Sequence, residues 1–248
     1  NVFYNSRYNA DFGKIDFQIG YTNKEFGANS FYTPKYPDQF EHTKTSFASL
    51  KLEAGEKIKF IPSVYYRRHQ DRFELFRYEP ASWYTGHNYH LTDVYGANML
   101  ARFISRAGTT SIGAEIRSEN ILSNVLGEPM SDTLSAVGEP DGFYTKRYAR
   151  IITNYYLEQS FYVGNFSISG GLLASWVSKN DDALNIYPGI EMSYRFFKSL
   201  STYLSINKSL RLPTFTDLFY SGPNNVGNPD LKAEEAMSYE WEIKYNSR

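Results

Sequence analysis

The sequence predicts an all-β protein, an antiparallel up-and-down β-barrel that crosses a membrane. Three observations support this fold class. Apolar residues recur at every second position, as in Ile186, Ile190 and Met192, rather than at the 3.6-residue period of a helix. Many of the alternating segments run to ten residues or more, the length of a tilted strand in a bilayer. Short and long connections alternate along the chain, which sorts the tight turns to one end of the meander.

Eleven strands follow from this alternation, and no segment shows a convincing helical period. In residues 14–21, Ile15, Phe17 and Ile19 alternate with charged or amide side chains. In residues 57–67, Ile58 and Phe60 begin the same pattern. The expected strands cover residues 1–9, 14–21, 43–54, 57–67, 91–106, 109–119, 145–161, 164–178, 186–196, 200–210 and 236–245.

The connections between these strands fall into two classes. Short ones lie near residues 10–12, 55–56, 106–108, 162–163 and 198–199. Long ones, richer in Pro, Asn, Asp and Gly, cover roughly 25–42, 73–90, 120–144, 179–184 and 211–235. A soluble sandwich or propeller has no reason to sort its loops by end, whereas membrane barrels have short turns on one side and long loops on the other.

One face of the expected sheet is charged. Its members are Lys14, Asp16, Glu115, Arg117, Glu191, Arg195, Glu240, Glu242 and Lys244. These side chains cannot form a dry core, so they fit the wall of a wide, wet or plugged lumen with the apolar face turned to lipid. The alternative is a solvated outer face around a small soluble barrel, and the sorted loops favour the membrane barrel.

The composition excludes several other classes of protein. The 26 Lys and Arg residues balance 27 Asp and Glu residues, which predicts no nucleic-acid partner. The absence of cysteine excludes disulfides, thiolate metal sites and a thiol nucleophile. No apolar run approaches the 18 or so residues of a spanning helix, and the 17% aromatic content argues against disorder.

The chain has the pattern of an incomplete barrel. Eleven is an odd number of strands, whereas bacterial barrels have an even number. The sequence also begins inside a strand pattern and stops just after another strand. We therefore expect residues 1–248 to be one partial β-barrel domain.

The segment 206–245 carries a family resemblance. The resemblance rests on Arg211, Pro213, Thr214, Asp217 and Leu218, then Gly227, Asn228, Pro229, Asp230, Leu231, Lys232 and Glu234, then Tyr239 and Glu240. In order and spacing, this segment resembles the strand, long loop and next strand of TonB-dependent outer-membrane receptors. The chain departs from the family pattern at Asp217, where Glu is usual, and at Ala233, where a second Pro is usual.

The residue types of this segment indicate loop architecture rather than a reaction centre. The prolines fix φ, the glycines permit unusual backbone angles, and Asn228-Pro229-Asp230 favours a turn. Arg211 is expected to hold a carboxylate, Asp217, Glu234 or Glu235, through a bidentate pair. A structural role is favoured over direct contact with a ligand.

The resemblance implies a function and a set of partners. The resemblance implies a 22-stranded barrel closed by an amino-terminal plug. It also implies import of a ferric siderophore, cobalamin or a similar scarce nutrient, with no resident cofactor. This chain would be a middle segment of such a barrel, with the plug and the C-terminal strands absent. The implied partners are the lipid of a Gram-negative outer membrane, the metal chelate, and the TonB complex acting through the absent plug. A surface lipoprotein that caps the long loops is a further candidate. The spacer 219–228 leans towards cobalamin receptors.

Aromatic residues cluster in the expected long loops and are candidates for contact with a bulky chelate. They are Tyr32, Tyr36, Trp83, Tyr84, Phe143, Tyr144, Phe219 and Tyr220. The alternative is that they form an aromatic girdle or pack the loops themselves. Metal binding stays unknown, because His87, His90 and Asp93 lack the order of a recognised site, and the loop carboxylates lack the spacing of a calcium loop.

Three rival functions remain open. A passive porin would share the turns, the girdle and the charged lumen, but it would lack the segment 211–240. An outer-membrane enzyme would need a nucleophile, a base and an orienting group, and no motif such as Gly-x-Ser-x-Gly is present. A soluble carbohydrate-binding β-sandwich is the third alternative. We expect no catalytic residues.

Overall fold

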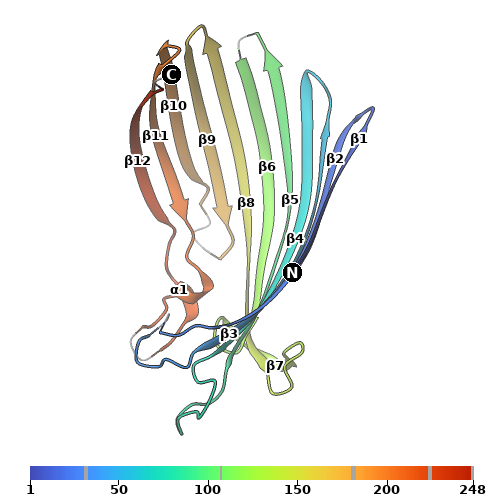
Figure 1. Ribbon diagram of the computed structural model, residues 1–248, viewed down its shortest axis with the longest axis vertical. Helices are drawn as coiled ribbons and strands as arrows, with labels where there is room; N and C mark the ends of the chain where they lie inside the picture. Colours follow the sequence, from blue (N-terminus) through green and yellow to red (C-terminus); the bar gives the residue numbers. More distant parts are fainter. Residues whose placement is uncertain (31–32, 107, 180–182, 223–224, 247–248) are drawn as a thin grey trace.

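The computed structural model describes residues 1–30, 33–106, 108–179, 183–222 and 225–246. Twelve strands form a single antiparallel sheet, which curves like one wall of a barrel (Figure 1). The strands are β1 (Val2–Ala10), β2 (Gly13–Gly27), β3 (Phe40–Ala54), β4 (Ile58–Glu74), β5 (Asn88–Ser105), β6 (Gly108–Ser123), β7 (Glu128–Ser135), β8 (Phe143–Val163), β9 (Phe166–Val177), β10 (Asn185–Phe197), β11 (Leu200–Arg211) and β12 (Glu234–Tyr245). The helix α1 (Phe215–Phe219) lies between the last two.

The eleven expected strands are all present, and each pairs with the next in an up-and-down order. The strands are longer than the hydrophobic alternation indicates; β4, for example, continues beyond residue 67 to Glu74. Its last residues, from Arg68 onward, are mostly polar, yet they keep their pairing with β3 and β5. The predictions of an all-β fold and of an antiparallel up-and-down strand order are therefore confirmed.

Two elements were missed by the sequence analysis. Strand β7 lies inside the expected long loop 120–144, and it pairs only with β8, with a shift in register between Pro129 and Leu134. Its sequence does not alternate, so the periodicity does not reveal it. The helix α1 is five residues long, too short to show a helical period. No helix among the described residues is long and apolar enough to span a membrane.

The connections are sorted by end as expected. All five tight turns lie at one end of the wall, and the long loops, with α1 and β7, lie at the other (Figure 1). Gly55 and Gly108 stand at two of the tight turns with φ of 95° and 134°, a region that L side chains rarely adopt. We call these two ends of the wall the turn end and the loop end.

Alternation in the strands gives the wall two chemically different faces. Across five neighbouring strands, Phe17, Leu50, Val64, Ala97 and Ile116 stand in one row, and most of these apolar side chains are exposed. The residues between them in sequence form the opposite face, where Tyr65 donates to Glu115 and Tyr156 donates to Asn98, both at 2.8 Å. We call the apolar face the outer face and the polar face the inner face.

Two small clusters of buried apolar residues lie at the loop end, on opposite faces of the wall. The outer cluster joins Tyr89, Leu91, Ala136 and Tyr144. The inner cluster joins Ile121, Leu126, Tyr148 and Leu218.

The segment 127–142, which contains β7, folds over the outer face, and we call it the flap. Gln70 donates to the carbonyl of Val137 at 2.6 Å, and Arg72 contacts Glu139 at 2.6 Å. Gln70 and Arg72 share their face of β4 with Val64 of the apolar row, which places the flap on the outer side.

Candidate functional site

The segment 211–234 joins β11 to β12 at the loop end. Arg211, at the end of β11, makes two parallel hydrogen bonds to Glu234, at 2.8 and 2.7 Å. Its Nη1 also lies 3.6 Å from Asp217. The expected bidentate pair is therefore present with Glu234, while Glu235 pairs instead with Lys208 at 2.9 Å. This fork closes the base of the loop, because it ties the first residue of the loop to the last.

Residues 214–217 form a capping box at the start of α1. The amide of Asp217 donates to Thr214 Oγ1 at 3.1 Å, and the amide of Thr214 donates to Asp217 Oδ2 at 2.8 Å. The backbone hydrogen bond from Thr214, together with its hydroxyl, lowers the pKa of Asp217. Asp217 departs from the Glu of the family pattern, but its carboxylate makes the reciprocal contact that the box requires.

Leu218 anchors α1 to the inner face of the wall. Its side chain is 5% exposed and packs with Ile121, Leu126 and Tyr148. Phe219 extends the contact, because its ring lies 4.7 Å from that of Tyr148. The loop is thus held inside the mouth of the curved wall rather than outside it.

After α1 the loop turns back, and the backbone at Gly227 passes close to the backbone at the end of α1. The amide of Gly227 donates to Tyr220 O at 2.6 Å, and a Cβ at Gly227 would lie 2.7 Å from the amide nitrogen of Phe219. Asn228 then forms a turn by accepting from the amide of Asp230 at 2.9 Å. Only glycine fits at 227 without displacing α1.

The remaining residues of the motif have different surroundings. Pro229 and Leu231 lie beside Leu218 in a small hollow, and Lys232 lines a second hollow of about 290 Å³ with Arg211 and Asp217. Tyr239 is 73% exposed on the outer face of β12. Glu240, its neighbour, is on the inner face, so these two residues take no part in the loop.

The aromatic residues of the first two long loops form one cluster. The ring of Phe76 lies 5.1 Å from Tyr36, 5.6 Å from Trp83 and 5.3 Å from Tyr84. The Tyr84 hydroxyl accepts from the amide of Leu75 at 3.1 Å, and burial raises its pKa. Trp83 is 56% exposed, so the cluster has an open apolar face. Tyr36, Trp83 and Tyr84 are thus brought together, whereas Tyr32 lies outside the described residues.

The other predicted aromatic residues lie elsewhere. Tyr144 is 1% exposed inside the outer cluster, beneath the flap, so it does not face the mouth of the wall. Phe143 beside it is 48% exposed. Phe219 and Tyr220 pack against the inner cluster with α1. The predicted set therefore divides among three places, because the flap turns outward while α1 turns inward.

The histidines of the second loop do not converge on a metal site. His87 contacts the Tyr84 hydroxyl at 3.0 Å, and His90 contacts the Ser123 hydroxyl at 2.8 Å. Asp93 is on the opposite face of β5 from His90 and holds Arg68 through two hydrogen bonds. Within the described ranges, no three His, Asp or Glu side chains are placed to share a metal ion.

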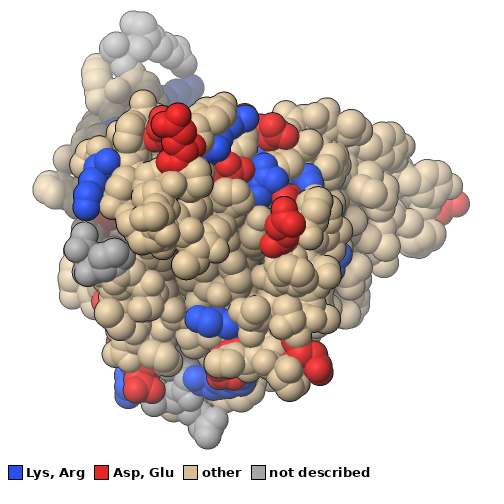
Figure 2. Space-filling model, turned by 90° about the horizontal axis from the view of Figure 1, so that it is seen from below, with Lys and Arg blue, Asp and Glu red and all other residues tan. Residues whose placement is uncertain are grey.

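Sequence reasoning missed two residues of this region. Phe76 is the centre of the aromatic cluster, and the density of aromatic residues in 73–90 was the signal for it. Arg150 joins the inner face to the motif segment, since it donates to Pro213 O at 2.7 Å. Its place in the alternation of β8 assigns it to the charged inner face. Seen from the loop end, acidic and basic side chains are interspersed over one face (Figure 2).

Comparison with known proteins gives one family and a set of solved structures. The family model described as TonB dependent receptor-like, beta-barrel matches residues 1–248. A ferric enterobactin receptor mutant (PfeA) from Pseudomonas aeruginosa is 13% identical with a TM-score of 0.72, covering 96% of this chain and 38% of that one. The FrpB iron transporter from Neisseria meningitidis is 15% identical with a TM-score of 0.68, covering 98% and 42%.

A third similar structure is the siderophore receptor PirA from Pseudomonas aeruginosa, at 13% identity and a TM-score of 0.66, covering 96% of this chain and 41% of that one. The chain therefore spans about two fifths of the length of these receptors. Comparison with curated protein sequences gives no significant match.

The family match covers every residue of the chain, and the fold agrees with it independently. The family consists of receptors and transporters rather than enzymes, and its barrels lie in the outer membrane of Gram-negative bacteria. The apolar outer face is accordingly the lipid-facing side. The chain belongs to the TonB-dependent receptor-like β-barrel family.

Proposed function

We propose that this chain is the wall and part of the ligand-facing loops of a receptor that imports a ferric siderophore by TonB-dependent transport. The observation that carries the proposal is the sorting of the long loops, with the aromatic cluster and the motif segment, to one end of a family barrel. The similar structures are a ferric enterobactin receptor, an iron transporter and a siderophore receptor, which supports an iron chelate over cobalamin.

The aromatic cluster of Tyr36, Phe76, Trp83 and Tyr84 is the proposed contact for the chelate. Edge-to-face packing holds the rings rigid, and the exposed face of Trp83 offers flat apolar area at little cost in entropy. A bulky chelate with aromatic or aliphatic arms suits such a surface. The motif segment has a supporting role, since its side chains are engaged with one another and with the inner cluster.

Transport requires parts that this chain does not supply. In the proposal, a plug domain and the TonB complex move the chelate inward, and outer-membrane lipid surrounds the outer face. A surface lipoprotein over the long loops is a further proposed partner. The curved inner face, with its charged and hydroxyl side chains, is the side that a plug would face.

The test is ligand binding by the full-length protein in detergent. A panel of ferric siderophores and cyanocobalamin would be titrated against the wild type and the Trp83→Ala variant, with Tyr239→Ala on the lipid-facing side as a matched control. We expect tight binding of one ferric siderophore, a loss of about 1–3 kcal/mol in Trp83→Ala, and no change in the control.

Other outcomes would favour the rivals. Tight binding of cyanocobalamin alone would change the cargo and keep the receptor. Absence of binding together with open-channel conductance in planar bilayers would overturn the receptor and leave a porin.

A further inference from the structure

Asp71 is a carboxylate on the inner face of β4, in the polar extension beyond the apolar row. Its neighbours across the sheet are Thr43 of β3 and His90 of β5. Its Oδ1 is buried and accepts no hydrogen bond from the described part of the chain. The sheet continues for several strands on both sides of β4, and this chain already covers the oxygen. The missing partner is therefore not a consequence of an open sheet edge.

Other acidic side chains at the loop end have a cation beside them. Asp93 contacts Arg68 at 2.7 Å, and Glu139 contacts Arg72 at 2.6 Å. Among the residues that the structure describes, no Lys, Arg or His makes an ion pair with Asp71. Asp71 thus differs from these carboxylates in lacking a compensating charge.

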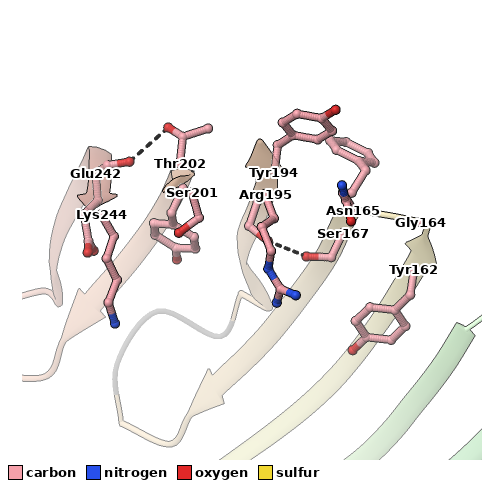
Figure 3. A pocket seen from close by; sticks show the side chains of 13 residues that line it. Tyr162, Gly164, Asn165, Ser167, Tyr194, Arg195, Ser201, Thr202, Glu242 and Lys244 are labelled. Atoms are coloured by element: carbon pink, nitrogen blue, oxygen red, sulfur yellow. Dashed lines mark hydrogen bonds between the residues drawn. The ribbon is translucent and has the colours of Figure 1, made fainter. Parts of the chain in front are cut away.

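The cost of an unpaired charge depends on whether water reaches it. Arg195 also has no ion pair within the described ranges, but it is exposed and extends into an open polar groove of about 600 Å³ at the turn end (Figure 3). Water solvates a guanidinium in that position. The buried oxygen of Asp71 has no such access, so ionisation of Asp71 leaves a poorly compensated charge in the wall.

The charged residues nearest to Asp71 on the inner face do not supply this compensation. Glu41 of β3, one row nearer to the loops, adds a second negative charge. Lys24 of β2 is in the same row as Asp71 but two strands away, which places their backbones about 10 Å apart. Arg67 is four residues away along β4, with His69 between them.

The two histidines on this face are neutral at pH 7. His69 Nδ1 lies 2.7 Å from Thr45 Oγ1, and burial lowers the pKa of this histidine. His90 Nδ1 accepts from the hydroxyl of Ser123, because that oxygen already accepts from two backbone amides. Burial lowers the pKa of His90 to about 4. Neither ring carries a positive charge that would stabilise the carboxylate of Asp71.

These surroundings make the folded wall hold a proton on Asp71. Burial, and after it the charge of Glu41, raises the pKa of Asp71 from 3.8 to about 7. Below 3.8 the group is protonated whether the site is closed or open. Between 3.8 and about 7 an opened site releases the proton and a closed one keeps it, so the stability of the closed site falls as pH rises. Above about 7 no further loss occurs.

The position of Asp71 links this proton to the aromatic cluster. β3 begins at Phe40, directly after the loop that carries Tyr36, and β4 ends at Glu74, directly before the loop that carries Phe76. The rings of Tyr36 and Phe76 lie 5.1 Å apart. Asp71 lies three residues before the end of β4, so it is at the root of both loops.

We infer that Asp71 is a proton-dependent clamp at the root of the two aromatic loops. Neutral Asp71 keeps the loop ends of β3, β4 and β5 together, and its ionisation loosens them and the aromatic cluster that they carry. The clamp itself does not depend on the cargo. Its consequence for ligand binding rests on the proposed function: the cluster is best ordered for a chelate in mildly acidic surroundings.

The experiment is amide hydrogen exchange of the full-length protein in detergent, without ligand, from pH 5 to pH 9. After correction for intrinsic rates, exchange in residues 40–45, 69–74 and 88–92 should rise by up to about tenfold per pH unit between pH 5 and pH 7. It should level off above pH 7. Asp71→Asn, which keeps the shape without the charge, should remove the rise and keep exchange at the level of the wild type at pH 5.

A second variant tests the same group without replacing it. Glu41→Gln removes the neighbouring negative charge, so the rise should end at a lower pH than in the wild type. Asp93→Asn is the matched control on the outer face of β5, and it should leave the rise between pH 5 and pH 7 in place, because Arg68 lowers the pKa of Asp93. Heat-modifiable mobility on gels confirms that each variant forms its barrel.

Three results would overturn the inference: a flat wild-type profile between pH 5 and pH 7, a rise that persists in Asp71→Asn, or a rise that Glu41→Gln does not move. Siderophore binding is measured on the same preparations at pH 7. Because the exchange measurement contains no ligand, failure of the clamp and failure of the receptor function give different results.

Discussion

Arg150 bonds at the same time to Glu119 on the neighbouring strand and to the backbone of Pro213 in the motif segment. Its Nε donates to Glu119 at 2.7 Å, and its Nη1 donates to Pro213 O at 2.7 Å. Glu119 is also held by Arg117 at 3.0 Å. One guanidinium therefore fixes the position of the loop against the wall of the barrel.

Replacing Arg150 with Gln should loosen the motif segment without unfolding the barrel. The loss of a charge-assisted hydrogen bond to a carbonyl costs about 1.5–3 kcal/mol, and Glu119 keeps Arg117 as a partner. Amide hydrogen exchange should accelerate in residues 214–220. Arg147→Gln, on the outer face of the same strand, is the control and should leave exchange unchanged; equal acceleration in both variants would contradict the role of Arg150.

Replacing Leu218 with Ala should undock α1 from the inner cluster. A buried Leu to Ala change costs about 2–5 kcal/mol through lost burial and the cavity left behind. Protease cleavage within 212–222 should appear in intact protein while the barrel keeps its heat-modifiable mobility. Leu218→Met, which conserves volume, should resist cleavage like the wild type.

Gly113 and Gly170 should respond differently to the same added methyl group. A Cβ at Gly113 would collide with the ring of Tyr156, whose hydroxyl donates to Asn98 at 2.8 Å on the inner face. Nothing lies within 4 Å of the corresponding position at Gly170. Gly113→Ala should lower the unfolding free energy by about 1–3 kcal/mol, and Gly170→Ala should not. Urea titration of barrel tryptophan fluorescence measures both.

The capping box of α1 should weaken in acid. The pKa of Asp217 is lowered in the folded protein, so its contribution is complete above the ordinary value of 3.8 and is lost as pH falls through the lower folded value. Hydrogen exchange at residues 214–218 should therefore be flat from pH 7 to pH 5, after correction for intrinsic rates, and rise below that window. Asp217→Asn should remove this extra rise; an unchanged profile in the variant would assign it to another group.

The strands and the sorting of the loops were predictable because both follow from local chemistry. A strand that faces lipid on one side and a polar lumen on the other must alternate, as Ile186 to Phe196 does. The tight turns were predictable from the same pattern, because they are the short connections between consecutive alternating segments. The pair of Arg211 with a carboxylate was also predictable, since its partner is only one loop away.

The location of the loop aromatics was not predictable from the sequence. Tyr144 and Tyr148 are four residues apart in one strand, yet one is buried on the outer side and the other packs with α1 on the inner side. Their surroundings depend on how the flap and α1 fold back, which is a matter of tertiary packing rather than periodicity. For the same reason, the sequence did not reveal that Phe76 lies at the centre of the aromatic cluster.

The flap packs on the outer side of the polar extension of β4, through Gln70 to Val137 and Arg72 to Glu139. It thickens the barrel from outside and leaves the entrance clear, whereas α1 occupies space within the entrance. A change in the length of the flap would therefore act on the outside of the wall and leave the packing of α1 unchanged. The flap and α1 thus have different surroundings, the first on the outer side of the wall and the second on its inner side.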